Sequence, residues 1–346
     1  MLIIESFTVP YMNRLVILVP NWLGDAVMAL PAIADVRRAA PAASITVAAR
    51  ASIAPLFAMA PDVDQTLTLG GAEAETLAAQ RFDTALLLPN STRAAIVARR
   101  AGVAARWGYR TGWRGSLLTR AIPAPRGVHQ IEYYQHLVRA LGFPSGPAEP
   151  RLTVSGEARQ AGLNLLMEAG WNGQQPLVAL APGAAYGGAK RWPPEYFAEL
   201  ADGLAADGVQ CVMVGTAADA GAAHDVERSA TSSRSIVSLV GRTDLPTLAG
   251  VLANSRALVT NDSGAMHLAA AVGIAVTAMF GPTNEQATSP RTRNPEPRMP
   301  NPESRTTILT HSVWCRPCML RECPLDHRCM RGIEVATVLE AARSSL

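Results

Sequence analysis

Residues 257–279 read ALVTNDSGAMHLAAAVGIAVTAM, and this stretch decides the fold. A short β-rich run over 257–260 is followed by an alanine-rich helical run that begins near Ala265, and a second β-rich run covers 275–279. Two short apolar strands joined by one helix are typical of a βαβ unit, because parallel strands need a long crossover between them. The stretch therefore predicts an α/β fold built on a parallel sheet.

The same alternation continues outward from this unit. Further strands are expected at 15–19, 45–49, 66–69, 84–88 and 106–109 in the first half of the chain, and at 177–181, 209–214 and 236–239 in the second. Helices are expected over 26–40 and 130–141, from Ser155 to near Gly170, and from near Pro194, Asp219 and Asp244. Segment 143–151, FPSGPAEPR, is rich in proline and glycine and indicates a linker.

The linker divides the chain into two predicted domains, because 346 residues are enough for two cores of ordinary size. We expect an N-terminal domain over 12–150 and a C-terminal domain over 151–331, each an open Rossmann-like sheet. A C-terminal helix within 332–346 is expected to pack back on the first domain. Ligands of such sheets bind at the carboxyl ends of the strands, so a ligand-binding cleft is expected between the domains.

Charge and hydropathy exclude several classes of protein. The 31 basic and 28 acidic residues give a net charge of +3, too small an excess to indicate a nucleic-acid-binding protein. The longest apolar stretch, 268–282, is shorter than the ~20 residues that a membrane-spanning helix needs. Residues 1–11 contain Glu5 and Pro10 and lack the pattern of a secretory signal, so a cytosolic protein is expected, and Met12 is an alternative start.

Arginines gather in the first half of the chain. They are Arg93, Arg99, Arg100, Arg106, Arg110, Arg114, Arg120 and Arg126. A basic cluster of this kind can face a polyanionic substrate or an anionic membrane surface, and it can equally be a solvated surface. The sequence leaves these alternatives open.

The loops that follow the predicted strands carry polar groups. In the first of them, NWLGD at 21–25, Gly24 permits a tight turn, and Asp25 either opens onto the cleft or caps the next helix. In the loop APGAAYGGAKRWP at 181–193, Gly183 and its small neighbours let backbone NH groups approach phosphate oxygens, while Lys190 supplies positive charge. It is not a Walker loop, because Arg191 follows Lys190, and an ordinary surface loop is the alternative.

A third loop, TNDSGAMHL at 260–268, opens the helix of the first βαβ unit. Ser263 and the NH groups of Gly264 and Ala265 would form a helix N-terminus that attracts a diphosphate, with Asp262 placed to hold sugar hydroxyls. The alternative is simple capping by Asp262 or Ser263, with His267 packed or facing solvent.

Asp219 follows another strand of the second half, where it would either meet ribose hydroxyls or cap the next helix. Taken together, three loops of one domain supply phosphate charge, a phosphate cradle and a ribose ligand, which predicts a nucleotide site. A nicotinamide dehydrogenase is disfavoured, because the GxGxxG fingerprint is missing at the expected place.

Two further segments stand out near the C-terminus. Four cysteines are closely spaced, with His311 and His327 nearby: Cys315, Cys318, Cys323 and Cys329. One spacing is typical of structural zinc and the others are looser, so reduced or weakly metal-binding thiols are favoured over a metal knuckle or an iron–sulfur site. The proline-rich segment 283–307 is long for a loop and is expected to be mobile rather than functional.

Several motifs of the chain resemble one known family. They are LGDAVMALP at 23–31, APGAAYGGAKRWP at 181–193, NDSGAMHLAAA at 261–271, FGPT at 280–283 and CRPCMLRECPLDHRCM at 315–330. The sequence resembles the bacterial lipopolysaccharide heptosyltransferases of glycosyltransferase family 9, from about Arg14 to the C-terminus. The resemblance implies the GT-B architecture of two Rossmann-like domains, inversion at the anomeric centre, ADP-L-glycero-β-D-manno-heptose as donor and no required metal or other cofactor. The long 283–307 segment and residues 1–11 depart from the family pattern.

The resemblance also implies roles for the donor-side residues. Asp25 corresponds to the general base that deprotonates the acceptor hydroxyl, and Lys190 would neutralise the leaving ADP. The turn of Ser263, Gly264 and Ala265 would bind the diphosphate. Asp262 would lie near the heptose, Asp219 near the ribose and Gly183 in the donor loop, while His267 would support the site.

The implied acceptor is heptosyl-Kdo2-lipid A, whose phosphates and carboxylates give the arginine cluster a purpose. Arg93, Arg110 and Arg114 are the expected contacts. We therefore expect a monomer that binds no nucleic acid and meets the cytoplasmic face of the inner membrane peripherally. A heptosyltransferase for another acceptor step is the alternative within the family, and a non-catalytic nucleotide-binding protein is the alternative outside it.

Overall fold

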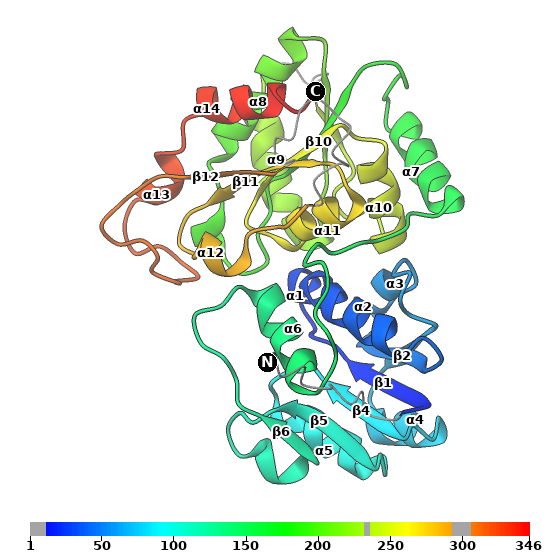
Figure 1. Cartoon of the computed structure of the whole chain (residues 1–346). Helices are drawn as coiled ribbons and strands as arrows, with labels where there is room; N and C mark the ends of the chain where they lie inside the picture. Colours follow the sequence, from blue (N-terminus) through cyan, green and yellow to red (C-terminus); the bar gives the residue numbers. More distant parts are fainter. Residues whose placement is uncertain (1–11, 232–235, 293–305) are drawn as a thin grey trace, which may run out of the picture. The chain divides into compact units, whose positions relative to one another are not determined.

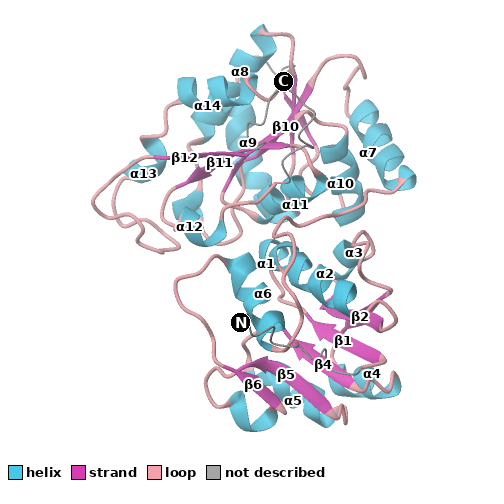
Figure 2. Ribbon diagram, in the orientation of Figure 1, coloured by secondary structure: helices cyan, strands magenta, loops and turns pink. Residues whose placement is uncertain are grey.

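A computed structural model describes residues 12–231, 236–292 and 306–346. Residues 1–11, which bear on the choice of start methionine, and 293–305, the centre of the proline-rich segment, lie outside the described residues. The chain divides between Leu152 and Thr153 into two compact units. Each unit is a parallel sheet covered by helices, as the sequence predicts (Figures 1 and 2).

The first unit contains a six-stranded sheet in the order β3-β2-β1-β4-β5-β6. Its strands are β1 (Arg14–Leu18), β2 (Ser44–Arg50), β3 (Gln65–Leu69), β4 (Thr84–Leu87), β5 (Ala105–Tyr109) and β6 (Arg120–Ile122). Neighbouring strands are parallel, with Leu15 of β1 beside Ile45 on one side and Thr84 on the other. The chain moves outward in opposite directions from β1 and β4, so the ligand-binding switch point lies at their carboxyl ends.

The second unit repeats this arrangement in the order β12-β11-β10-β7-β8-β9. Its strands are β7 (Leu177–Ala181), β8 (Gln210–Met213), β9 (Ile236–Ser238), β10 (Ala257–Asn261), β11 (Ala275–Phe280) and β12 (Thr306–Thr310). The central strands β7 and β10 are buried along their whole length, because each is covered by helices on both faces of the sheet. Their pairing, with Ala257 beside Val178, places the loops after β7 and β10 side by side at the switch point.

The helices of the first unit connect these strands. They are α1 (Leu23–Met28), α2 (Leu30–Ala39), α3 (Ala54–Phe57), α4 (Glu73–Ala79), α5 (Thr92–Arg100), the 3-10 turn η1 (Arg114–Leu117) and α6 (Gln130–Ala140). The single helix expected over 26–40 is in fact two, joined at Ala29. Pro31 in the first turn of α2 explains the break, because its ring has no NH and clashes with the preceding turn.

The helices of the second unit begin close to the predicted positions. They are α7 (Gly156–Glu168), η2 (Gly188–Lys190), α8 (Pro194–Ala206), η3 (Ala217–Asp219), α9 (Ala220–Ser229), α10 (Leu245–Ala253), α11 (Gly264–Val272), α12 (Glu285–Thr288), α13 (Arg328–Arg331) and α14 (Val335–Arg343). Ser155 caps α7 as expected, because its hydroxyl accepts a hydrogen bond from the NH of Ala158. None of the described helices is long and apolar enough to cross a membrane.

The C-terminal segment packs within the second unit. Val338 and Ala342 of α14 are buried in the same apolar cluster as Leu200 and Leu204 of α8. The indole NH of Trp192 donates a hydrogen bond to the Ile333 carbonyl just before α14. The expected packing of 332–346 on the first domain stays a prediction.

Candidate active site

An ion pair joins the two central loops of the second unit. The Lys190 ammonium lies 2.5 Å from a carboxylate oxygen of Asp262, and both side chains are almost buried. The same carboxylate oxygen accepts a hydrogen bond of 2.7 Å from the Thr283 hydroxyl, which follows β11. Lys190 and Asp262 were both predicted as site residues, and the adjacency of β7 and β10 brings them together. Thr283 ends the FGPT motif, but no role was predicted for it from the sequence.

The buried amide of Asn261 holds this loop pair in place. Its Nδ2 donates to the Pro182 carbonyl at 2.8 Å, and its Oδ1 accepts a hydrogen bond of 3.0 Å from the NH of Trp192. One side chain at the end of β10 therefore fixes both ends of the 182–192 loop. Because a buried amide needs partners for its donors and its acceptor, this geometry is costly to disturb.

The 186–190 loop is clamped by the cysteine-rich segment. Ala189 donates its NH to the Arg321 carbonyl at 2.9 Å, and Gly188 donates its NH to the Glu322 carboxylate at 3.0 Å. A side chain at Gly187 would collide with the Arg321 backbone. The interpretation of these NH groups as a phosphate cradle is therefore wrong for Gly188 and Ala189, because both groups are already bonded. The small residues admit a neighbouring segment instead.

Lys190 also contacts an aromatic face. Its ammonium lies 4.7 Å from the centre of the Tyr186 ring, and the Tyr186 hydroxyl donates a hydrogen bond of 2.8 Å to the Met319 carbonyl. The carboxylate and the ring together fix where the positive charge is held. Lys190 is thus a partly buried cation in η2, in the loop that follows the central strand β7, and among the described residues its charged partner is Asp262.

The N-terminus of α11 lies beside this ion pair. Ser263 occupies the N-cap position, but within the described residues its side chain makes no capping hydrogen bond, and its hydroxyl lies 3.0 Å from that of Thr260. The alternative of capping by Ser263 is therefore wrong. The first NH groups of any helix have no acceptor within that helix, so those of Gly264 and Ala265 are oriented for an anion. His267, the last residue predicted in this loop, is buried in α11.

Asp219 closes its own 3-10 turn and does not cap the next helix. It occupies the N-cap position of α9, but within the described residues its side chain makes no capping hydrogen bond to that helix, so the interpretation of Asp219 as a cap of the next helix is wrong. Its carboxylate accepts hydrogen bonds from the NH and the hydroxyl of Thr216, at 2.9 and 2.8 Å. The same side chain lies against Gly183, where any Cβ would collide with it. Gly183 therefore permits the loop after β8 to approach the loop after β7. A contact of Asp219 with ribose stays a prediction.

Asp25 lies in the first unit, at the carboxyl end of the central strand β1. It is the third residue of α1 and half-buried, whereas Trp22 occupies the N-cap position. The interpretation of Asp25 as an N-cap is therefore wrong. Burial, and secondarily the negative charge of Asp25, raise the pKa of Tyr134 well above its usual value. Asp25 thus shares its surroundings with a neutral tyrosine hydroxyl.

The three predicted acceptor arginines differ in exposure. The Arg93 side chain is two-thirds exposed and pairs with Glu73 at 3.1 Å, and Arg110 is exposed directly after β5. Arg114, in contrast, is completely buried. Its guanidinium donates to the backbone carbonyls of Leu87, Pro89, Ser91 and Tyr109. Direct contact of Arg114 with an acceptor is therefore ruled out, because its donors are occupied inside the unit.

The cysteines are free thiols in the structure. Burial, and then the neighbouring Cys323, raise the pKa of Cys329. Within the described ranges, no three His, Cys, Asp or Glu side chains form a group that could hold a metal ion. Cys211 belongs to the core of β8 as expected, where burial raises the pKa of its thiol to about 12.

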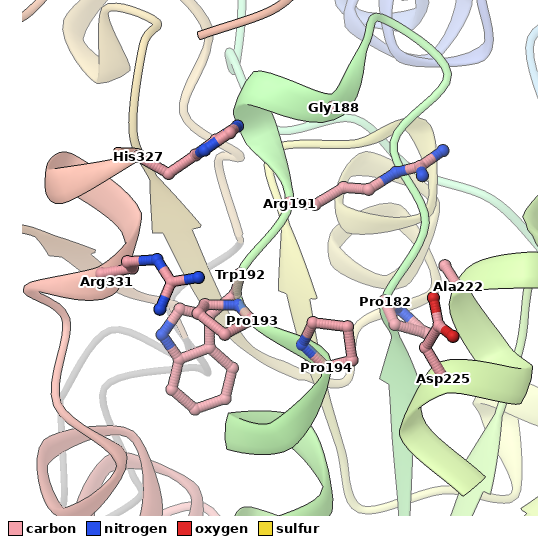
Figure 3. Close-up of a pocket in the computed structure, with 10 residues that line it drawn as sticks. All are labelled: Pro182, Gly188, Arg191, Trp192, Pro193, Pro194, Ala222, Asp225, His327 and Arg331. Atoms are coloured by element: carbon pink, nitrogen blue, oxygen red, sulfur yellow. The ribbon is translucent and has the colours of Figure 1, made fainter. Parts of the chain in front are cut away.

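A cavity of about 190 Å³ lies beside the donor loop, over the start of α8 (Figure 3). Arg191 and Trp192 come from the loop, Asp225 from α9, and His327 and Arg331 from the α13 region. Among the residues that line it, none is a predicted donor residue.

Comparisons with known proteins agree on one family. The model of "Glycosyltransferase family 9 (heptosyltransferase)" matches residues 72–328. Lipopolysaccharide heptosyltransferase 2 of Escherichia coli K12 is 30% identical over 80% of this chain and 85% of its own length. Lipooligosaccharide heptosyltransferase 2 of Haemophilus influenzae is 29% identical over 80% of this chain and 86% of its own. The solved structure of E. coli ADP-heptose LPS heptosyltransferase II superposes with a TM-score of 0.82 at 28% identity, covering 96% of this chain and 98% of that one.

Proposed function

Since this chain belongs to glycosyltransferase family 9, the heptosyltransferases, we propose that it transfers L-glycero-D-manno-heptose from ADP-heptose to the first heptose of the lipopolysaccharide inner core. The enzyme is a glycosyltransferase. The observation that carries the proposal is the Lys190–Asp262 pair beside the N-terminus of α11. Two sources of positive potential meet there, at the switch point of a parallel sheet.

The donor diphosphate binds across this pair. When ADP-heptose arrives, its phosphate oxygens compete with Asp262 for the Lys190 ammonium and accept hydrogen bonds from the NH groups of Gly264 and Ala265. Asp262 is then released towards the heptose hydroxyls while Thr283 holds one of its oxygens. Asp219 and Gly183 supply the ribose end of the site.

Transfer proceeds by direct displacement at the anomeric carbon. Asp25 removes the proton of the acceptor hydroxyl as that oxygen attacks, and the ADP diphosphate departs with its negative charge neutralised by Lys190. The acceptor oxygen attacks the anomeric carbon on the face opposite to the departing ADP, so the anomeric configuration is inverted. Arg93 and Arg110 contact the anionic acceptor, and the monomeric enzyme meets this lipid at the cytoplasmic face of the inner membrane.

ADP release tests the proposal. With ADP-heptose as donor, the protein should release ADP with heptosyl-Kdo2-lipid A and not with Kdo2-lipid A, which lacks the first heptose. Consumption of Kdo2-lipid A instead would assign the enzyme to the preceding acceptor step. If neither acceptor leads to ADP release, both of these transfer steps are excluded, which leaves a later heptosyl transfer or a non-catalytic nucleotide-binding protein.

Substitution of the base separates binding from turnover. Asp25→Asn should lower kcat by roughly 10²- to 10⁴-fold, because a general base of this kind contributes about that much. Its affinity for ADP, measured by calorimetry, should stay that of the wild type. Unchanged turnover in this variant would remove Asp25 from the mechanism.

A further inference from the structure

The most exposed large apolar side chain of the described residues is Trp113, at 94%. It lies in the turn 110–113 that follows β5, at the carboxyl edge of the first sheet. Since β5 is two strands away from β1 in the sheet order, the turn lies roughly 10 Å along the same edge from the loop of Asp25. An oligosaccharide of several sugars whose reacting hydroxyl is at Asp25 is long enough to reach this turn.

Hydrogen bonds from the side chains of Arg114 and Thr111 hold the turn in place. Arg114 is fully buried, and its Nε donates to the Tyr109 carbonyl at 2.9 Å. The other donors of its guanidinium bind carbonyls at the end of β4 and in the loop after it, and the Thr111 hydroxyl donates to the Asn90 carbonyl at 3.0 Å. A Cβ at Gly108 would lie 2.5 Å from the Arg114 guanidinium, so the glycine leaves room for it. The side chains of Arg114 and Thr111 thus tie the strand-end loops of β4 and β5 together.

Burying a guanidinium is costly unless its donors are satisfied, so the carbonyls that satisfy those of Arg114 also hold the turn in place. What the turn displays to solvent is an indole ring and a cation. Arg110 is exposed, and its side chain runs across Gly115, whose position for a Cβ lies 3.1 Å from the Arg110 Cγ. Trp113 and Arg110 therefore belong to one small, preorganised surface.

We propose that Trp113 is a stacking platform for a sugar ring of the acceptor, with Arg110 binding an anionic substituent of that sugar. The apolar C–H face of a pyranose packs on an indole ring, and binding covers an aromatic surface that folding leaves in water. Because the backbone of the turn is held in place, only the two side-chain torsions of the indole lose freedom on binding. Arg114 is a positioning residue, because it acts only by holding the turn. This inference rests on the proposed function.

The test uses a water-soluble acceptor, the deacylated phosphorylated heptosyl-Kdo2 oligosaccharide. Trp113→Ala should raise its KM about tenfold, the size expected for loss of one aromatic stacking contact, and leave the KM of ADP-heptose unchanged. Trp113→Phe should recover part of the loss, because a smaller ring still stacks. The matched control is Trp314→Ala, which removes a ring that is 79% exposed in the second unit and should change neither KM.

Binding without donor gives an independent readout. Addition of the oligosaccharide should change the tryptophan fluorescence of the wild type, and most of that change should disappear in Trp113→Phe. An acceptor KM within twofold of the wild type in Trp113→Ala would overturn the inference. So would a defect seen only with acceptor embedded in vesicles, which would make Trp113 a membrane contact. A wild type that releases no ADP at all contradicts the proposed function instead, so the two failures are distinguishable.

Discussion

The two units hold a buried cation beside a strand end in different ways. In the first, the described acceptors of Arg114 are backbone carbonyls at the ends of β4 and β5 and in the loop after β4. In the second, Lys190 is held by a carboxylate and an aromatic face. A carbonyl cannot leave without unfolding its loop, whereas under the proposed mechanism a diphosphate replaces the Asp262 carboxylate as the partner of Lys190. Whether such a cation holds a loop in place or is available to a ligand therefore depends on its partners more than on its residue type.

Removal of Lys190 should have the largest effect. Lys190→Ala should lower kcat by about 10²- to 10³-fold, because one preorganised group that stabilises the leaving charge is lost. Steady-state ADP release measures this loss, and calorimetry should show weaker ADP binding. The control is Arg191→Ala, which removes the exposed cation next in sequence. Activity within threefold of the wild type in Lys190→Ala would place the functional cation elsewhere.

Removal of Arg114 should act on stability instead. Arg114→Met should destabilise the first unit by about 2–3 kcal/mol, because several carbonyls lose their donor together. Thermal unfolding followed by calorimetry measures the loss. ADP affinity should be unchanged, since the donor residues belong to the other unit. The control is Arg110→Ala, an exposed neighbour, and an equal loss of stability in that variant would contradict the distinction between the two arginines.

Two helix N-termini of the second unit also differ in their partners. That of α10 has a side-chain cap, whereas that of α11 has none within the described residues. Asp244 caps α10 by accepting a hydrogen bond of 2.8 Å from the NH of Thr247. Asp244→Ala should cost about 1 kcal/mol at pH 7. Hydrogen bonds from Thr247 lower the pKa of Asp244, so its stabilising effect is present above the usual aspartate pKa of about 3.9 and is lost as the pH falls through the folded value. The free energies of unfolding of the wild type and of Asp244→Ala, measured with urea, should converge as the pH falls below about 4.

Ser263→Ala should have the smallest effect. Because the Ser263 hydroxyl does not cap α11 within the described residues, the loss should stay within about 0.5 kcal/mol in the same urea experiment. A loss as large as that of Asp244→Ala would show that the hydroxyl does cap α11, and that its first turn is less available to a diphosphate.

Much of the fold was predictable from local pattern. Apolar runs of strand length that alternate with helical runs located the strands of both sheets except β6 and β12, which lie at sheet edges. β6 is three half-buried residues and β12 is half-buried with three threonines, so neither carries the apolar run of a central strand. Ser155 and Asp244 were predictable as caps, because capping depends on residues only three positions apart.

The site was predictable in part. Motifs identified the loops of Lys190 and Asp262, and the order of the strands then joined them. Which backbone NH groups are free to bind a ligand was harder to predict from the sequence. The NH groups of Gly188 and Ala189 are occupied by residues more than 130 positions away, and Asn261 fixes a loop nearly 80 positions away. No local pattern contains such partners.

The sequence by itself determined the alternation of strands and helices, the linker and the strand-end loops that carry the candidate donor residues, because these depend on period, propensity and short-range hydrogen bonding. Only the tertiary structure decided which polar groups are available to a ligand. Arg110 and Arg114 are four positions apart, yet one is exposed and the other is completely buried. The difference arises because burial and hydrogen-bond partners are set by strands that meet only once the sheet has formed.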